Sequence, residues 1–272
     1  MTGLLDMLVK VRPFTKSQRT TPYIGGFNQR PMELGADHVD FCSPMRAAVP
    51  LEIRDLTCRY GEDIALDQVS LKLAAGTIVG ITGSPGAGIS TLIKAIMLLV
   101  APLAGRVLIY GKPHELASSR AHLAYLPEAI RPPGHLSGQD FIRMAGTVRS
   151  VRVEASDIDG IASDLDLDPG LLPHPIRRYA KDDVQKLGLL CLFATERSIL
   201  LLDRPMSELE PPARASLRHR LKRHAANGGA VLIGSPDIED HQDIADSLLI
   251  LKDGRLAALE TVRLFEGSGI DA

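Results

Sequence analysis

A glycine-rich run in the first third of the chain has the spacing of a loop that binds phosphate. Residues 83–91 match the pattern G-x-x-x-x-G-K-[ST] at every fixed position except one, where Ile89 replaces the lysine. The glycines let the main chain wrap round a phosphate, and the hydroxyl of Ser90 is suited to coordinating Mg²⁺. Isoleucine supplies none of the positive charge that lysine places at the β- and γ-phosphates. The contacts to a nucleotide expected from this run are Gly83, Gly86, Ala87, Gly88, Ile89, Ser90 and Thr91.

The segments on either side of this run have the apolar patterns of a strand and a helix. Thr77–Thr82 is short and largely apolar, as in a buried strand, and Thr91–Leu99 has helical apolar spacing. A strand, a glycine loop and a helix in that order aim main-chain N–H groups and a helix N-terminus at an anion. A tight strand-to-helix turn needs glycine in any case, so the loop alone does not decide for nucleotide binding.

Buried strands alternate with helices along the rest of the chain. Residues 198–203 and Ala230–Gly234 are apolar runs of strand length, and each follows a stretch of helical spacing, Val184–Ala194 or Pro212–Ala226. Such alternation favours a parallel sheet with helices packed on its faces. The sequence therefore predicts an α/β fold.

The first 48 residues differ in composition from the rest of the chain. They are rich in proline and glycine, and only Leu4–Val11 shows a short apolar period. We expect residues 1–48 to form an N-terminal extension before a domain that spans residues 49–272. The extension can be a poorly ordered tail or a docking arm for a membrane partner, and its composition leaves both interpretations open.

The overall composition excludes some partners. Apolar residues make up 45% of the chain and charged residues 24%, and the net charge of -2 gives no basic excess for nucleic acid. The most apolar stretches, Leu92–Ala104 and Leu187–Leu202, are interrupted by charges, so we expect no direct membrane span. Three widely spaced cysteines suggest reduced thiols in a cytoplasmic protein.

Further motifs, in order along the chain, strengthen the interpretation of the glycine loop. From about residue 50 onward the sequence resembles the ATPase subunits of ABC transporters, particularly those of ABC-2 exporters. Tyr60 stands where that family stacks an aromatic ring on adenine. The other matches are the Q-loop form "GYLPE" at residues 124–128, the Walker B strand at 200–203, the D-loop at 207–210, the H-loop at 231–237 and the closing motif "VLILHDGRL" at 248–256.

The resemblance implies a P-loop NTPase fold of the ABC ATPase type. This fold has a mostly parallel sheet flanked by helices, an antiparallel β subdomain and a helical subdomain, here at about residues 129–183. The resemblance also implies ATP and Mg²⁺ as cofactors, with Ser90 and Asp203 as metal ligands. The implied partners are a transmembrane transporter subunit and a second ABC subunit, in a homodimer or a heterodimer. They would hold the chain on the cytoplasmic side of the inner or plasma membrane.

The departures from the family pattern fall on the residues that carry its chemistry. The glutamate that polarises the attacking water, directly after Asp203, is Arg204, and the switch histidine is Pro236. A guanidinium has no acceptor for a proton, and proline has no side-chain donor for the γ-phosphate. The substituted positions are Ile89, Glu128, Arg204 and Pro236, with Ala180 and Asp182 in the signature motif at residues 179–183. Together they predict a pseudo-ATPase.

The signature motif and Arg204 also bear on a dimer. In ABC dimers the signature faces the partner's ATP, so the carboxylate of Asp182 would repel its γ-phosphate. Three roles for Arg204 stay open from the sequence. It can pair with Asp182 or Asp183 of a second copy, it can supply the charge that Ile89 lacks, or it can pair with a local acid such as Glu208.

The leading functional hypothesis is a hydrolysis-deficient ABC subunit with a structural or regulatory role in a membrane transport complex. One alternative is a slow but active transporter ATPase. Another is a soluble interaction protein that kept the fold and left transport. A site that drifted without any new role for the replacements also fits one sequence, although the buried strand patterns and the D-loop frame are intact.

Overall fold

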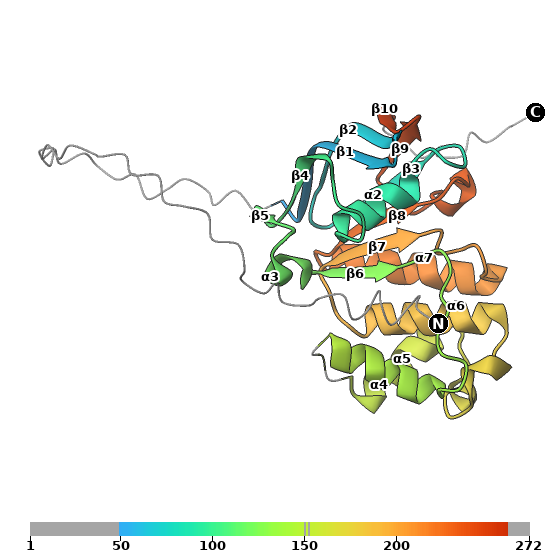
Figure 1. Cartoon of the computed structure of the whole chain (residues 1–272). Coiled ribbons are helices and arrows are strands. Elements are labelled where there is room, and N and C mark those ends of the chain that lie inside the picture. The colour runs from blue at the N-terminus through green and yellow to red at the C-terminus, as the bar shows by residue number, and fades with distance from the viewer. Residues whose placement is uncertain (1–48, 150, 152, 261–272) are drawn as a thin grey trace, which may run out of the picture.

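The computed structural model describes residues 49–149, 151 and 153–260 (Figure 1). The predicted extension at residues 1–48, including its possible role as a docking arm, lies outside the described residues, as does the end of the predicted domain after residue 260. The described residues form two β-sheets with helices packed against them. The domain boundaries themselves stay predictions.

The larger sheet has six strands and carries the predicted glycine loop. Five neighbouring strands run parallel, and the edge strand β10 is antiparallel to its neighbour. In spatial order the strands are β10 (Arg255–Glu260), β9 (Ser247–Lys252), β3 (Ile78–Thr82), β8 (Ala230–Gly234), β7 (Ile199–Asp203) and β6 (Leu123–Leu126). Because β3, β8, β7 and β6 are parallel, the loops that follow them meet at one edge of the sheet.

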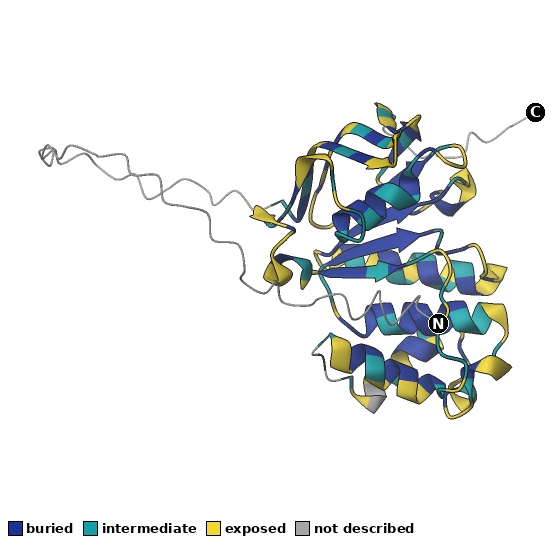
Figure 2. Cartoon of the chain, in the orientation of Figure 1, coloured by how far each residue is buried: buried dark blue, intermediate teal, exposed yellow. Residues whose placement is uncertain are grey.

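The central strands of this sheet are apolar on both faces. Every residue of β3, β7 and β8 is buried, as Figure 2 shows in dark blue. Along β7, Leu200 and Leu202 belong to one core, while Ile199 and Leu201 belong to the core on the opposite face. Such period-two division between two cores requires continuous apolar runs, which is why these strands could be recognised from the sequence.

A smaller antiparallel sheet lies over the helix that follows the glycine loop. Its pairing has β1 between β2 and β4, and β5 at the edge. The strands are β2 (Asp63–Leu73), β1 (Leu51–Tyr60), β4 (Ala104–Ile109) and β5 (Lys112–Pro113). Buried residues of β1 and β2 share one apolar core with that helix and the larger sheet, so this sheet fixes the helix from above (Figure 1).

The helices lie on both faces of the larger sheet. The helix α2 and the smaller sheet cover one face, and α6 and α7 cover the other, with α4 and α5 packed beyond α6 (Figure 1). The helices are α2 (Ile89–Ile96), α3 (Ala117–Arg120), α4 (Gly138–Val148), α5 (Ala155–Asp164), α6 (Lys181–Phe193) and α7 (Pro211–Ala226). The described part of the chain also contains the short 3₁₀ turns η1 (Pro169–Leu171), η2 (Ile176–Arg178) and η3 (Ile238–Asp240).

The predicted α/β architecture is therefore present, with differences in detail. The helix after the glycine loop begins at Ile89, two residues earlier than the apolar spacing suggested, because Gly88 ends the loop in a left-handed conformation. The strands β4, β5, β6, β9 and β10 were not predicted as strands. β6 is only four residues long, so its apolar run is too short to stand out.

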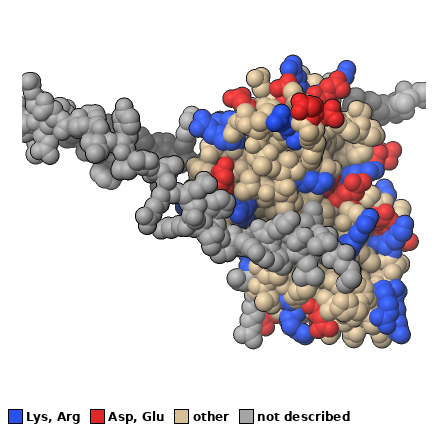
Figure 3. All heavy atoms as spheres, viewed as in Figure 1, with Lys and Arg blue, Asp and Glu red and all other residues tan. Residues whose placement is uncertain are grey.

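The surface and the helices bear on possible partners. On the face seen in Figure 3, basic and acidic side chains are interspersed over the described residues. Every helix in the described part of the chain is too short or too polar to cross a bilayer.

Candidate functional site

The loop between β3 and α2 depends on glycine for its shape. Gly88 has φ 107° and Gly86 has φ 86°, in the left-handed region that other residues avoid. A Cβ at Gly88 would lie 2.5 Å from the carbonyl oxygen of Ala65, so no side chain fits there. Within the loop, the N–H of Ala87 donates to the carbonyl of Ser84 over 2.9 Å. The main chain is thus held in a tight turn that opens onto the N-terminus of α2.

The N-terminus of α2 carries no compensating negative charge of its own. Gly88 caps the helix without a side-chain hydrogen bond, and the first turn contains no acidic residue. Free N–H groups at a helix N-terminus, together with the helix dipole, favour an anion. The glycine loop and this helix end therefore fit a phosphate group.

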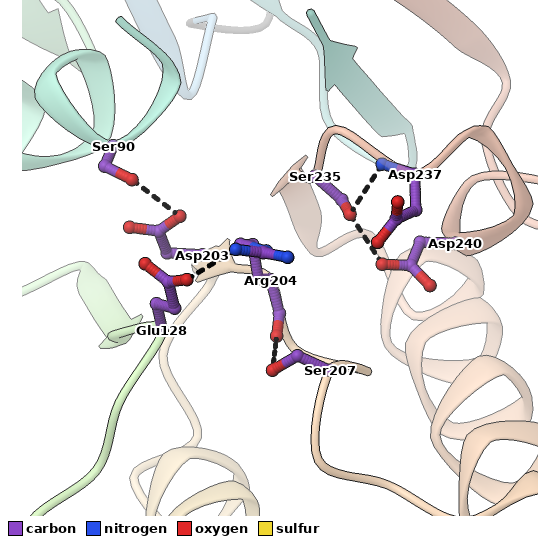
Figure 4. Close-up of polar contacts among 8 residues, drawn as sticks. All are labelled: Ser90, Glu128, Asp203, Arg204, Ser207, Ser235, Asp237 and Asp240. Atoms are coloured by element: carbon purple, nitrogen blue, oxygen red, sulfur yellow. Dashed lines mark hydrogen bonds and ion pairs between the residues drawn. The ribbon is translucent and has the colours of Figure 1, made fainter. Parts of the chain in front are cut away.

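Ser90 and Asp203 bring two oxygen ligands together beside the loop. Asp203 is the last residue of β7 and is 2% exposed, and it accepts a hydrogen bond of 3.1 Å from Ser90 Oγ (Figure 4). Burial raises the pKa of Asp203, and the hydrogen bond from Ser90 counteracts part of that rise. A carboxylate and a hydroxyl are the donor set that Mg²⁺ prefers, so the pair fits the predicted metal ligands.

Ile89 lies in the apolar core. It is 9% exposed, and a Cβ at Gly234 would lie 2.5 Å from Ile89 Cγ2, so the isoleucine packs directly on the main chain at the end of β8. Its neighbours include Ile93 one turn further along α2. The residue that replaces the expected lysine has become part of the packing between α2 and the sheet.

Arg204 is held in a turn directly after Asp203. Its φ is 48°, its N–H donates to the carbonyl of Gly234 over 2.7 Å, and its carbonyl accepts from Ser207 Oγ over 3.0 Å. Its guanidinium forms an ion pair of 2.6 Å with Glu128 Oε1 (Figure 4). The strands β6 and β7 are neighbours, so the residues that follow them meet across the sheet edge.

This ion pair shows that one of the three roles left open for Arg204, pairing with a local acid, is present in the structure. The residue does pair with a local acid within its own chain, but the acid is Glu128. The suggestion of Glu208 was wrong, because that choice rested on proximity in sequence. Proximity in space follows instead from the parallel pairing of β6 with β7.

The loop after β8 is fixed by its own side chains and main chain. Ser235 Oγ donates to Asp240 Oδ2 over 2.6 Å and accepts from the N–H of Asp237 over 3.2 Å (Figure 4). The carbonyl of Pro236 accepts from Thr82 Oγ1 over 3.1 Å. Pro236 thus contributes a main-chain acceptor that ties this loop to the end of β3, at the position where the family resemblance implied a histidine.

A different histidine stabilises the same loop, and the sequence reasoning missed it. His241 is 3% exposed and its Nε2 donates to the carbonyl of Ser235 over 3.1 Å. Burial lowers the pKa of His241, and the Ser235 carbonyl with the charges of Asp240 and Asp237 offsets only part of that effect. The signal available in the sequence was a histidine directly after the acidic run of residues 237–240, which alone does not indicate burial.

The signature residues lie at the start of α6. Ala180 is the N-cap of that helix and makes no side-chain capping bond. Asp182 Oδ2 pairs with Lys186 Nζ over 2.6 Å, and Asp182 Oδ1 accepts from the N–H of Glu210 over 3.1 Å. Both carboxylate oxygens are therefore engaged within the chain, where they connect α6 to the start of α7.

Lys186 is the buried partner of this network. It is 5% exposed and also donates to the carbonyl of Asp166 over 2.8 Å. Burial by itself would lower the pKa of Lys186, but the hydrogen bond from its ammonium to Asp182 and the nearby negative charges raise it overall. The i,i+4 spacing of Asp182 and Lys186 on a helix was the signal that could have revealed the pair.

Tyr60, the expected adenine contact, ends β1 in the smaller sheet. It is 51% exposed, and Gly61 beside it has φ 59° in the turn to β2. The exposed ring is available for stacking. The other predicted site residues lie elsewhere, at the edge of the larger sheet: the phosphate loop, Glu128, Asp203, Arg204 and the loop after β8.

Comparison with known proteins identifies the family. A family model described as ABC transporter matches residues 66–207, just over half of the chain. The chain belongs to the ABC transporter family. The matched residues include the phosphate loop, Glu128, the signature region and Asp203 with Arg204.

Curated members of the ABC transporter family align with most of the chain. A daunorubicin resistance ATP-binding protein from Streptomyces coeruleorubidus is 28% identical over 74% of the chain, and the match spans 64% of that relative's length. A putative ABC transporter ATP-binding protein from Halobacterium salinarum is 28% identical over 76% of the chain and 91% of its own length. An ABC-type transporter ATP-binding protein from Bacillus subtilis is 26% identical over 78% of the chain and 87% of its own length.

Solved structures of the ABC transporter family share the fold. The ATP-binding subunit of an ABC transporter superposes with a TM-score of 0.72, with 26% identity, over 78% of this chain and 90% of its own. A dimeric bacterial ABC transporter cassette superposes with a TM-score of 0.71 at 19% identity, over 79% of this chain and 100% of its own. The predicted P-loop NTPase fold of the ABC ATPase type is confirmed.

Proposed function

We propose that this chain serves a membrane transport complex as an ATP-binding subunit that hydrolyses ATP too slowly to act as a motor. The observation that carries the proposal is Arg204, which follows Asp203 directly and whose guanidinium is ion-paired with Glu128. Hydrolysis needs a group that orients a water molecule and accepts its proton. A guanidinium stays protonated and has no acceptor, so it cannot do this.

The other substitutions support the same conclusion. Ile89 is committed to the core, and Pro236 offers a carbonyl that is bonded to Thr82. Neither residue supplies the cationic or hydrogen-bond donor that stabilises charge on a transferred phosphate. Removing one such donor commonly lowers a rate by about 100-fold or more.

The residues that remain suit binding better than chemistry. ATP would be held by the main chain of residues 83–88, by Ser90 and Asp203 through Mg²⁺, and by the exposed ring of Tyr60. When bound, Mg²⁺ would neutralise phosphate charge. These assignments are proposals that rest on the turn geometry, the helix N-terminus and the hydrogen bond between Ser90 and Asp203.

The proposed partners are a transmembrane subunit and a second ABC subunit. The relatives from Streptomyces coeruleorubidus and Bacillus subtilis are named as ATP-binding proteins of drug resistance and of transport, and one cassette with this fold is dimeric. A transmembrane subunit as partner would place the chain at the cytoplasmic side of the membrane. Its role there would be structural or regulatory.

The test is steady-state hydrolysis of Mg·ATP by the purified full chain. Active enzymes commonly turn over about 1 to 1,000 times per second, and we expect the wild type to stay below about 0.01 per second. The variant Arg204→Glu/Pro236→His restores an acceptor and a donor and should raise the rate at least about tenfold. Turnover at the usual rate of transporter motors by the wild type would overturn the proposal.

A matched control guards against contaminating ATPases. Ser90→Ala removes the proposed metal ligand, so any hydrolysis that belongs to this site should disappear in that variant. Hydrolysis that persists in Ser90→Ala comes from another protein and does not count toward the rate.

A slow but active ATPase is the second candidate, and Glu128 is the observation that favours it. Its carboxylate lies at the same sheet edge as Asp203 and is ion-paired with Arg204. A carboxylate released from that pair has the acceptor that arginine lacks. Loss of residual, Ser90-dependent hydrolysis in Glu128→Gln would support this candidate over the non-hydrolysing one.

A further inference from the structure

We infer that Arg204 binds the terminal phosphate of a nucleoside triphosphate in place of the missing lysine, and that Glu128 is an exchangeable partner that holds the guanidinium until then. The inference rests on the proposed function, because it takes ATP as the ligand of the same site. It goes further by giving Arg204 a positive role and by making the Glu128 contact responsive to nucleotide.

The backbone of Arg204 lies next to the position of the missing lysine. Gly234 accepts the N–H of Arg204 over 2.7 Å, and the same glycine is covered by Ile89 Cγ2. The two residues therefore flank one point at the end of β8. A long cationic side chain that starts at Arg204 has its origin beside the phosphate loop and the N-terminus of α2.

The positive charge of the site is displaced along the chain. The family resemblance implies lysine in the phosphate loop and glutamate directly after the Walker B aspartate, where this chain has Ile89 and Arg204. The Q-loop form "GYLPE" itself ends in glutamate, so Glu128 agrees with that form. The chain therefore lacks a cation in the loop and has one at the end of β7, where a charged ligand of the loop could meet it.

The ion pair with Glu128 leaves the guanidinium incompletely satisfied. One terminal nitrogen bonds Glu128, while Arg204 Nε is buried and has no acceptor among the described residues. The side chains of Arg204 and Glu128 are 38% and 48% exposed, and ion pairs of that exposure are weak and easily exchanged. Phosphate oxygens can engage two guanidinium donors at once, so a polyphosphate competes well for this side chain.

The exchange has a structural consequence for the segment after β6. Glu128 lies near the start of the connection of residues 127–137, which leads from β6 into α4. While Arg204 bonds Glu128, the start of that connection is tied to the end of β7. When the guanidinium turns to a phosphate, Glu128 is released. Nucleotide binding is thereby coupled to the mobility of the segment that joins the sheet to the helices α4 and α5.

The first experiment measures binding of a fluorescent ATP analogue and its ADP counterpart to the full chain. Arg204→Ala should weaken ATP binding by about tenfold or more while ADP binding changes by less than about threefold. Glu128→Gln should tighten ATP binding several-fold, because it removes the competitor. Arg143→Ala is the matched control, because it breaks another exposed ion pair, with Asp140 at 2.8 Å, and should change neither affinity.

The second experiment measures amide hydrogen exchange in residues 129–137. In the wild type, ATP should speed exchange there. In Glu128→Gln, exchange should already be fast without ATP. Arg204→Ala and Glu128→Gln must both show the wild-type circular dichroism spectrum. The gain in ATP affinity expected of Glu128→Gln cannot arise from misfolding.

The outcomes separate this inference from the proposed function. Equal weakening by Arg204→Ala and Glu128→Gln would mean that the pair is only structural, and the inference falls. Wild-type ATP binding that Arg204→Ala leaves unchanged would overturn the inference and leave the proposed function standing, whereas absence of ATP binding in the wild type would overturn both. Hydrolysis by the wild type at motor rates would reject the proposed function, yet opposite effects of the two variants on binding would still support the phosphate contact.

Discussion

The two halves of the candidate site present different kinds of groups, main-chain groups on one side and side chains on the other. On one side, the loop of residues 83–88 and the N-terminus of α2 present main-chain groups, shaped by glycines whose conformations other residues avoid. On the other side, the ends of β6 and β7 present the side chains of Glu128 and Arg204. The main-chain half matches the phosphate-loop pattern except at Ile89, and in the side-chain half Arg204 stands where the family resemblance implied a glutamate. Main-chain geometry is bound to the fold, whereas exposed side chains can be exchanged without loss of the fold.

Replacing Gly88 should give the largest effect, because it attacks the main-chain half directly. Gly88→Ala puts a Cβ 2.5 Å from a carbonyl oxygen at a φ of 107°. We expect the free energy of unfolding to fall by about 3 kcal/mol or more, measured by urea denaturation. The control Gly86→Ala has a similar φ but open space around its Cβ, and should lose about 1 kcal/mol. Equal losses would show that steric contact with the scaffold does not fix this loop.

The signature motif tests whether a side chain that departs from the family pattern also stabilises the fold. Asp182→Gly restores the residue of the family pattern, yet it leaves the ammonium of Lys186 nearly buried with a weaker set of partners. We expect a loss of about 2 kcal/mol in the free energy of unfolding. Asp183→Gly introduces the same residue one position later without breaking the Lys186 pair, and should cost about 1 kcal/mol. If Asp182→Gly proved no worse than Asp183→Gly, the replacement would have no structural role.

The smallest effect concerns the loop after β8 and its dependence on pH. Burial holds the pKa of His241 below the ordinary value. On acidification the unfolded chain therefore binds a proton at this histidine before the folded chain does. Stability should therefore fall as pH drops below about 6.5. His241→Gln should reduce the loss between pH 7.5 and 5.5 by about 1 kcal/mol. The control His219→Gln, on the exposed face of α7, should leave the loss unchanged. A loss as large in His241→Gln as in the wild type would contradict this role.

The framework of the fold was readable from the sequence because it rests on apolar periodicity. The strands β3, β7 and β8 are buried on both faces, and their continuous apolar runs mark them at nearly the observed bounds. The four-residue edge strand β6 and the strand β4 of the smaller sheet gave no comparable pattern. Their existence depends on neighbours that are distant in the sequence, such as the pairing of β6 with β7.

The site was predictable in its membership but not in its contacts. The glycine loop, Ser90 and Asp203 have fixed spacing, and the structure brings Ser90 and Asp203 within hydrogen-bond distance. The sequence left several partners open for Arg204, with Glu208 as an example of a local acid, whereas strand order places Glu128 beside it. The carboxylate of Asp182 accepts a hydrogen bond from the N–H of Glu210, 28 residues away. Local spacing in the sequence cannot reveal that bond.

The packing of Ile89 limits which residues position 89 can accept. Its side chain fills space against the main chain of Gly234, within an apolar core. A lysine there would take those atoms out of the core or bury an ammonium in it, and either change costs stability. A single Ile89→Lys substitution therefore sets the charge of the phosphate loop against the packing between α2 and the sheet.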